Sequence, residues 1–332
     1  MSQEKDLRRF ISRQANLLQL LGLAVLIFIL MTALNPEKFL RPYNFESLTF
    51  LAPELGLLSL AMMLSMLTGG IDLSVIGVAN LSGILAGLRF LTVGGAHGPS
   101  LTQLSFSWVA LGVATAVGAG MLAGVLNGFL IAKVRITPIL ATIGTGQLYV
   151  GICLVLSGGP AIVGFPNGWD AIGNAKLLGV ALPLVLFVVI AVLMALALAR
   201  TPLGVNLQLI GANPKAAVFA GIRTGRAILV SYAISGALAS IAGILLSARV
   251  NAAKADYGTS YLLEAVLISV LGGTNPAGGK ASVLGVAIAL VSLMLLSSGF
   301  QLLRFSNFLV DFIWGAFLLI VIAINALRNR ST

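Results

Sequence analysis

Four acidic residues could carry ion or proton chemistry, because each lies within or beside a strongly apolar run: Glu54, Asp72, Glu264 and Asp311. A charged side chain at the centre of a membrane helix costs roughly 2.5–3.5 kcal/mol on insertion scales, so it needs a partner or a task. Chains of intramembrane carboxylates serve as relays in ion-coupled pumps and transporters. These residue types therefore admit a proton or sodium relay.

The sequence around Asp72 favours a different role. It lies in LTGGIDLS (67–74), directly after the adjacent Gly69 and Gly70 and two residues before Ser74. A glycine pair interrupts a helix, and a carboxylate at the start of the next helix is stabilised by the free N–H groups and the helix dipole. We expect Asp72 to stabilise such a start. We count Gly69, Gly70, Asp72 and Ser74 as candidates for a broken helix beside a transport pathway.

Glu264 is less easily explained. It precedes a second glycine-rich break at Gly272 and Gly273, which makes these three residues further pathway candidates. A basic residue such as Lys280 or Arg249 could pair with it, and the sequence leaves the partner open. SMLTGG before SVIGVANL (65–81) is echoed by SVLGG before SVLGVAIAL (269–290), a pattern that an internal duplication would produce.

Other kinds of chemistry lack the residues they need. The single histidine, His97, and the single cysteine, Cys153, cannot build a metal site, so no metal is expected. The phosphate-binding pattern GxxxxGK[ST] is absent, because Ala281 follows the lysine of GGTNPAGGK (272–280). No catalytic constellation is visible. We expect a chain that is not an enzyme and has no cofactor of its own.

Composition indicates the elements that must position these residues. The 332 residues are 58% hydrophobic and 9% charged, with a mean hydropathy of +1.05, whereas soluble domains contain about 25% charged residues. The sequence predicts an all-α polytopic membrane protein with about ten transmembrane helices, some of them broken. The expected spans are 15–34, 47–67, 73–92, 106–131, 137–156, 178–199, 227–248, 261–272, 281–299 and 307–326.

Basic residues in the loops predict the orientation. With the N terminus inside, thirteen of the twenty Lys and Arg residues lie in cytoplasmic segments, so both termini are expected in the cytoplasm. The net charge of +10 reflects these loops and no nucleic-acid partner. We expect a single transmembrane domain over 1–332, with a cytoplasmic N-terminal segment 1–14, no cleavable signal peptide and a cytoplasmic loop 200–226.

The loop 200–226 contains its own short helix. Asn213 suits the N-cap, Pro214 the first helical position, and Gly221 the C-terminal stop, which predicts a helix over 214–220. Its small and apolar side chains (Ala216, Ala217, Val218, Phe219) suit a knob seated in another protein's cleft. The alternative is an amphipathic helix lying on the membrane surface.

The longest external loop, over 158–176, contains Phe165, Pro166 and Trp169. Aromatic residues of this kind anchor loops at the membrane interface. The same residues could form part of a docking or gating surface, and the sequence does not separate these two interpretations.

Four segments in order resemble one known family: LTGGIDLSVIGVANLSGILAG (67–87), RITPILATIGT (135–145), GVNLQLIGANPKAAVFAGI (204–222) and LEAVLISVLGGTNPAGGKASVLGVAIA (263–289). Together they look like the permease subunit of ATP-binding cassette importers for monosaccharides such as ribose, xylose, arabinose and galactose. The resemblance covers roughly residues 45–325, and GGIDLS followed by the Asn213–Ile222 segment is its most specific pair.

The resemblance implies partners and a mechanism. It implies a second permease, identical or related, a cytoplasmic ATPase that binds ATP and Mg²⁺, a periplasmic sugar-binding protein, and a location in the lipid of a bacterial inner membrane. It implies alternating access driven by the ATPase. Segment 213–222 would be the coupling helix seated in the ATPase, through Asn213, Pro214, Ala216, Ala217, Gly221 and Ile222. Lys215, Val218-Phe219 and Asn275-Pro276-Ala277 depart from the usual pattern, which leaves the particular sugar and the ATPase open.

Three rival functions remain for comparison. A branched-chain amino-acid permease of the same superfamily is the nearest rival. An ion-coupled secondary transporter would use Asp72, Glu264 and Asp311. A membrane enzyme lacks any visible cluster of His, Asp and Glu residues.

Overall fold

The computed structural model describes residues 2–93 and 105–330, so His97 lies outside the described residues. Within this part, eight helices are long and apolar enough to cross a membrane. They are α1 (Ser2–Leu34), α3 (Pro42–Leu67), α4 (Val75–Val93), α5 (Phe106–Phe129), α6 (Pro138–Ser157), α8 (Leu182–Arg200), α11 (Thr224–Val250) and α13 (Val283–Leu302). Two further apolar helices are α12 (Tyr261–Leu271) and α14 (Asn307–Arg330). The prediction of an all-α polytopic membrane protein is confirmed.

Short elements connect these helices. They are α2 (Pro36–Phe39), the π-helical turn η2 (Leu130–Val134), α7 (Asn167–Asn174), α9 (Pro202–Ala212), α10 (Pro214–Phe219), and the strands β1 (Ile162–Val163), β2 (Lys176–Leu177), β3 (Val180–Ala181) and β4 (Ala252–Ala253). β1 pairs antiparallel with β4, with Ile162 opposite Ala253, and β2 forms a hairpin with β3. Segments before α7 and after α11 are thereby joined.

The helices begin and end where local chemistry dictates. Proline occupies the first turn of α3, α6, α8, α9 and α10, where its missing N–H leaves no bond unmade. α6 ends at Gly158 and α11 at Asn251, both in the left-handed conformation that terminates helices. α12 is short, in agreement with the expected span 261–272. Its 11 residues rise about 16 Å, which is roughly half of a bilayer core.

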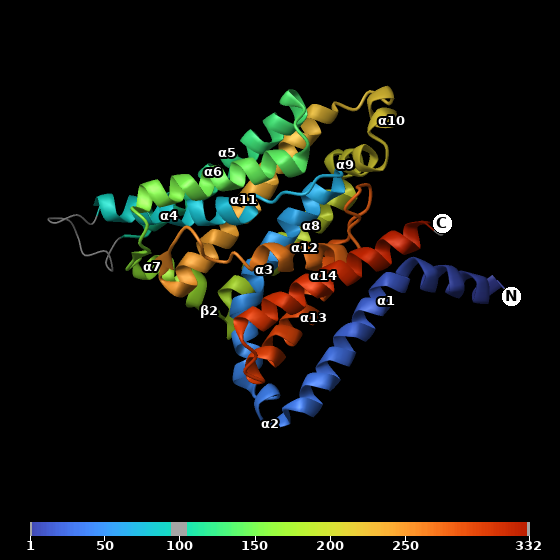
Figure 1. Cartoon of the computed structure of the whole chain (residues 1–332), viewed down its shortest axis with the longest axis horizontal. Coiled ribbons are helices and arrows are strands. Elements are labelled where there is room, and N and C mark those ends of the chain that lie inside the picture. The colour runs from blue at the N-terminus through green and yellow to red at the C-terminus, as the bar shows by residue number, and fades with distance from the viewer. Residues whose placement is uncertain (1, 94–104, 331–332) are drawn as a thin grey trace.

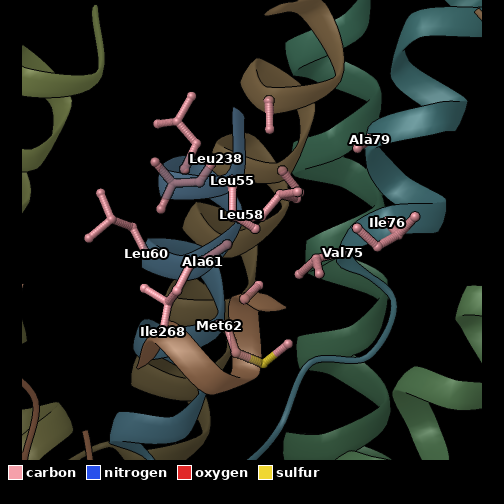
Figure 2. Close-up of a cluster of buried hydrophobic side chains, with 14 of the residues drawn as sticks. Leu55, Leu58, Leu60, Ala61, Met62, Val75, Ile76, Ala79, Leu238 and Ile268 are labelled. Carbon is pink, nitrogen blue, oxygen red and sulfur yellow. The ribbon is translucent and has the colours of Figure 1, made fainter. Parts of the chain in front are cut away.

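The core is organised around α3 and α11. α3 is buried from Pro53 to its end at Leu67, and α11 packs against α3, α4 and α5. Figure 2 shows Leu58 and Met62 of α3 near Leu238 of α11 and Val75 of α4. Helices that are apolar on all sides, as α3 is, belong in the interior of a bundle.

The ends of the chain share one side of the molecule. The start of α1 and the end of α14 lie toward the same side as α9 and α10, and α7 lies toward the opposite side (Figure 1). An even number of crossings produces this arrangement. It agrees with the predicted topology, in which both termini and the loop 200–226 face the cytoplasm.

In the loop before α8, the aromatic residue Trp169 packs inside the protein, which neither of the two interpretations of this loop predicts. Trp169 is fully buried, its indole N–H donates to Ser247 Oγ at 3.2 Å, and its ring lies 5.2 Å from that of Phe90 and 5.9 Å from that of Phe165. Trp169 is therefore a core residue that fixes α7 against α11, and its side chain is available neither as an interfacial anchor nor as part of a docking surface. The cause is a tertiary contact that spans about eighty residues of chain.

Glycines allow α5 and α11 to cross with their backbones in contact. A Cβ atom at Gly124 would lie 2.0 Å from the carbonyl oxygen of Tyr232, and one at Gly236 would lie 2.1 Å from that of Gly120. In a membrane, close approach of small residues supplies much of the packing energy between helices. The crossing has no room for even one methyl group at these positions.

Replacing Gly124 by alanine should therefore destabilise the protein by about 1–3 kcal/mol, the usual range for overpacking. Gly118→Ala on the same helix is the matched control, because nothing lies within 4 Å of its Cβ position. That control should be neutral or more stable by up to about 1 kcal/mol, since alanine favours helix. Thermal unfolding in detergent measures the stability of both variants, and equal melting temperatures of the two would contradict the close crossing.

Candidate functional site

Asp72 lies at the centre of a buried hydrogen-bond network in the segment that joins α3 to α4. Its Oδ1 accepts the Ser74 hydroxyl at 2.6 Å and the Ser74 backbone N–H at 3.1 Å, and its Oδ2 accepts the Ser235 hydroxyl of α11 at 2.9 Å. The backbone N–H of Asp72 donates to Ser65 Oγ at 3.2 Å. The carboxylate is 1% exposed, so all of its stabilisation comes from these donors.

The network continues into α5 and α6. Asn127 Nδ2 donates to Ser74 Oγ at 2.7 Å, and the Thr145 hydroxyl donates to Asn127 Oδ1 at 2.6 Å. Thr142 of α6 accepts the backbone N–H of Leu73 at 3.1 Å. The broken segment is thus tied by side chains to α5, α6 and α11, the helices that surround it.

This geometry supports the structural interpretation of Asp72. Ser74 takes the N-cap position of α4, because its carbonyl accepts the Val78 N–H at 2.9 Å, and the Asp72 carboxylate binds the N–H of that cap. Asp72 therefore lies at the start of α4, and its predicted role in stabilising that start stays a prediction. Sequence reasoning missed Asn127, Thr145 and Ser235. An Asn inside an apolar span invites the same question as an acid does, and this signal could have found Asn127.

Gly70 and Tyr232 are in close contact beside this network, which leaves no space for a side chain at position 70. A Cβ atom at Gly70 would lie 2.5 Å from Tyr232 Oη and 2.9 Å from Pro138 Cβ. Tyr232 is fully buried, and its hydroxyl has no partner among the described residues. Gly69 has φ +82, a conformation that L side chains rarely adopt. The two glycines are therefore required by the backbone path that brings Asp72 to Ser235.

The predicted short helix in the loop 200–226 exists as α10. Asn213 is its N-cap, and its Oδ1 accepts the Ala216 N–H at 3.0 Å; Pro214 opens the helix and Gly221 follows it with φ +77. Figure 1 shows α10 at the edge of the helical body. Phe219 is 91% exposed at the end of α10, beside the 58% exposed Val218. Two such side chains on a loop helix form an apolar knob without a partner in this chain.

Two of the residues assigned to that contact face inward. Ala217 is only 3% exposed, and Ile222 is half-buried against the apolar core. The prediction that Ala217 presents its side chain to a partner is wrong in this conformation, because its methyl group fills a space inside the chain. Asn213, Pro214, Ala216 and Gly221 are exposed, and Phe219 carries the largest exposed surface of the helix.

Backbone contacts connect α9, which precedes α10, to the break before Asp72. A Cβ atom at Gly211 would lie 2.0 Å from the Leu67 carbonyl oxygen and 2.3 Å from the Gly279 nitrogen. The Gly279 N–H donates to Leu67 O at 3.0 Å, and a Cβ at Gly69 would lie 3.2 Å from Ala277 O. Three segments thus meet with no intervening side chains. Displacement of one segment must displace the others, because packed backbones cannot be compressed.

Gly211→Ala should push α9 away from this junction and lower the transport activity expected from the resemblance by about tenfold or more, which corresponds to 1.4 kcal/mol or more of lost coupling. The matched control is Gly225→Ala, whose Cβ position has no atom nearer than 3.9 Å. Uptake and ATP hydrolysis are measured in the reconstituted complex. Unchanged uptake by Gly211→Ala would show that the junction does not transmit motion.

Glu264 and its glycines lie away from the Asp72 network. Arg249 pairs with Glu54 of α3, through Nε at 2.6 Å and Nη2 at 3.1 Å, so Arg249 is not a partner of Glu264. Among residues 17–93 and 105–323, whose side chains the structure describes, the Glu264 carboxylate forms no ion pair, Lys280 included. A Cβ at Gly272 would lie 2.6 Å from the Val286 nitrogen, so this break serves the packing of α12 on α13, and Gly273 has φ +90.

The two breaks share one design. Each follows a helix end, contains a glycine of positive φ, and precedes a helix capped by serine: Ser74 before α4 and Ser282 before α13. Ser282 Oγ accepts the Gly285 N–H at 3.0 Å. The described ranges contain no group of three or more His, Cys, Asp and Glu side chains that could hold a metal ion.

The fold and this site define a class: a multi-pass helical membrane protein with broken helices and a short exposed helix, α10, between α9 and α11. Residues 44–322 match the family described as "Branched-chain amino acid transport system / permease component". The chain therefore belongs to this family of transport permeases. The predicted resemblance to permeases of ATP-binding cassette importers is confirmed.

Curated relatives cover nearly the whole chain. The ribose import permease protein RbsC of Bacillus subtilis (strain 168) is 33% identical over 313 residues, which is 94% of this chain and 92% of that protein. The autoinducer 2 import system permease protein LsrD of Escherichia coli (strain K12) is 30% identical over 312 residues, 92% of this chain and 90% of that protein. No solved structure matches the chain.

Proposed function

We propose that this chain is the permease of an ATP-binding cassette importer that moves a simple sugar through the membrane by alternating access. The observation that carries the proposal is α10: a capped, exposed helix whose neighbour α9 is in backbone contact with the break before Asp72. A partner that closes around α10 would move this junction and, through it, the buried network. The relatives named for ribose and autoinducer 2 import support a sugar as the cargo.

The partners follow from this role. A cytoplasmic ATPase binds ATP and Mg²⁺ and receives α10 through Asn213, Pro214, Ala216, Gly221 and the exposed Phe219, with Ala217 and Ile222 holding the helix in place. A periplasmic binding protein delivers the sugar on the opposite face. A second permease, identical or related, completes the pathway in a bacterial inner membrane.

The pathway borders the two broken segments in this proposal. Gly69, Gly70, Asp72 and Ser74 form the first, and Glu264, Gly272 and Gly273 belong to the second. Asp72 serves as a structural acceptor, because every hydrogen bond it forms stays within the network of hydroxyl and amide donors. A relay of the kind that ion-coupled transporters use requires a continuing chain of titratable groups, and hydroxyl and amide side chains surround Asp72 instead.

Uptake into proteoliposomes tests the proposal. The permease is reconstituted with the ATPase and binding protein from its own gene neighbourhood, and labelled sugar uptake is followed with and without ATP. We expect uptake to require ATP and to survive an uncoupler of the proton gradient. Uptake that survives ATP depletion and collapses with the uncoupler would establish an ion-coupled transporter instead, and uptake of leucine in preference to sugars would establish the amino-acid alternative.

A further inference from the structure

A pocket opens on the face opposite α10, between the start of α3, the end of α7 and the end of α11. Its volume is about 320 Å³, near the lower limit of ligand pockets, which span roughly 300–1,000 Å³. It is lined by Tyr43, Glu46, Ser47, Phe50, Leu51, Asn174 and Arg249. Two aromatic rings and several hydrogen-bonding groups thus converge in a space that suits a small ligand.

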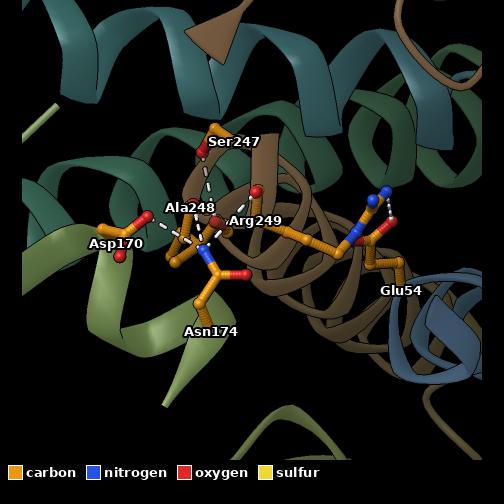
Figure 3. Close-up of polar contacts among 7 residues, drawn as sticks. Glu54, Asp170, Asn174, Ser247, Ala248 and Arg249 are labelled. Atoms are coloured by element: carbon orange, nitrogen blue, oxygen red, sulfur yellow. Dashed lines mark hydrogen bonds and ion pairs between the residues drawn. The ribbon is translucent and has the colours of Figure 1, made fainter. Parts of the chain in front are cut away.

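The polar groups of the pocket are held in place by bonds that leave other atoms free. Asn174 Nδ2 donates to Asp170 Oδ1 at 2.9 Å and lies within 3.3 Å of the Ala248 carbonyl oxygen. Its Oδ1 accepts nothing from the described residues, and Figure 3 shows this oxygen directed away from those contacts. Arg249 uses Nε and Nη2 for Glu54, as Figure 3 shows, while its Nη1 has no partner in the described ranges. Asn174 therefore has a free acceptor and Arg249 a free donor, and both residues line the pocket.

The charges of the pocket are already compensated within the chain. Arg249 forms a bidentate pair with the 1% exposed Glu54, and Glu46 forms an ion pair with Lys176. A phosphate or a cation would gain no unpaired counter-charge here and would disturb an existing pair. An uncharged ligand with several hydroxyl groups suits such a site, with its C–H surfaces against Tyr43 and Phe50.

We infer that this pocket is a low-affinity binding site for an uncharged monosaccharide on the external face of the permease. The inference rests on the proposed function, because it takes the cargo to be a sugar delivered to this face. The site would hold the sugar between its release from the binding protein and its passage along the helices. Its exposed position and few direct donors predict weak binding, in the millimolar range.

Saturation-transfer difference NMR with D-ribose tests the site, with the full permease in lipid nanodiscs. Ser47→Phe should fill the pocket and remove the signal. Tyr43→Ala removes a ring that is 78% exposed and does not support the fold, and it should weaken binding about two- to tenfold. The control is Phe308→Ala, which removes an 87% exposed ring of α14 that does not line the pocket, and its signal should equal that of the wild type.

Several outcomes would overturn the inference. They are equal signals from the wild type and both pocket variants, no wild-type signal at tens of millimolar ribose, and stronger binding of ribose 5-phosphate, which would indicate an anion site. Unchanged ribose signals together with lost stimulation of the ATPase by the loaded binding protein would assign the pocket to protein docking. The proposed function fails separately, if the wild-type complex imports no sugar with ATP.

Discussion

Replacing Phe219 by aspartate should abolish sugar uptake while leaving the permease folded and inserted. Phe219 is 91% exposed, so this chain loses almost no packing when the ring is removed. Burying a new, unpaired carboxylate in the cleft of the ATPase should cost about 2–5 kcal/mol, which weakens the contact roughly 30-fold to several thousandfold. The measurement is ATP-driven uptake, together with pull-down of the ATPase on the purified permease.

Phe219→Leu provides the control for this prediction. It keeps an apolar side chain at the same position, so it should retain most of the uptake and of the ATPase contact. Normal uptake by Phe219→Asp would show that α10 does not enter the partner. Loss of expression by Phe219→Asp alone would show that the ring has a role in folding that its exposure contradicts.

Removing the Asp72 carboxylate altogether should be the most damaging change inside the membrane. In Asp72→Leu the Ser74 hydroxyl and the Ser74 N–H lose their acceptor, and the Ser235 hydroxyl keeps only its longer bond to the Ala61 carbonyl oxygen, at 3.3 Å. Each buried group left without a partner costs about 1–3 kcal/mol, a large share of the roughly 5–15 kcal/mol by which proteins are stable. We expect little folded permease, as measured by yield and by thermal unfolding in detergent.

Asp72→Asn separates the structural role from an ionic one. The asparagine oxygen can still accept the bonds from Ser74, so this variant should fold and retain measurable uptake. Ser292→Ala is the control for hydroxyl loss, since Ser292 Oγ bonds only to Ile288 O of its own helix, at 2.9 Å, and it should change little. A folded Asp72→Asn permease with no uptake would instead indicate that the negative charge itself is required.

Much of the fold could be predicted because the membrane constrains each segment through local interactions. Every backbone group in the hydrocarbon must be satisfied within its own helix, so each span appears in the sequence as a predominantly apolar run. The ten expected spans correspond to ten helices, with most ends displaced by one to five residues. Asn213, Pro214 and Gly221 specify α10 in the same local way, since a cap involves neighbours only three residues apart.

The polar residues inside the spans could be located but not paired from the sequence. Arg249 and Glu54 are separated by 195 residues, and nothing in either segment indicates that Arg249 selects Glu54 and leaves Glu264 unpaired. Ser235 and Asp72 are 163 residues apart and meet where α11 packs against α3 and α4, with Gly243 of α11 close enough to α4 that a Cβ there would lie 2.1 Å from the Ala79 carbonyl oxygen. Pairing depends on the packing of helices, which is a property of the whole bundle.

The sequence by itself determined that this chain is a helical membrane protein with broken helices and a capped helix in the loop 200–226, because hydropathy, capping and glycine breaks act over a few residues. Only the tertiary structure decided which side of each element is available. It turned Ala217 inward and Phe219 outward, buried Trp169, and brought Gly211 against Leu67. The physical reason is that the exposure of a side chain depends on which elements pack against its helix. Helices of similar hydropathy pack against different neighbours in the bundle.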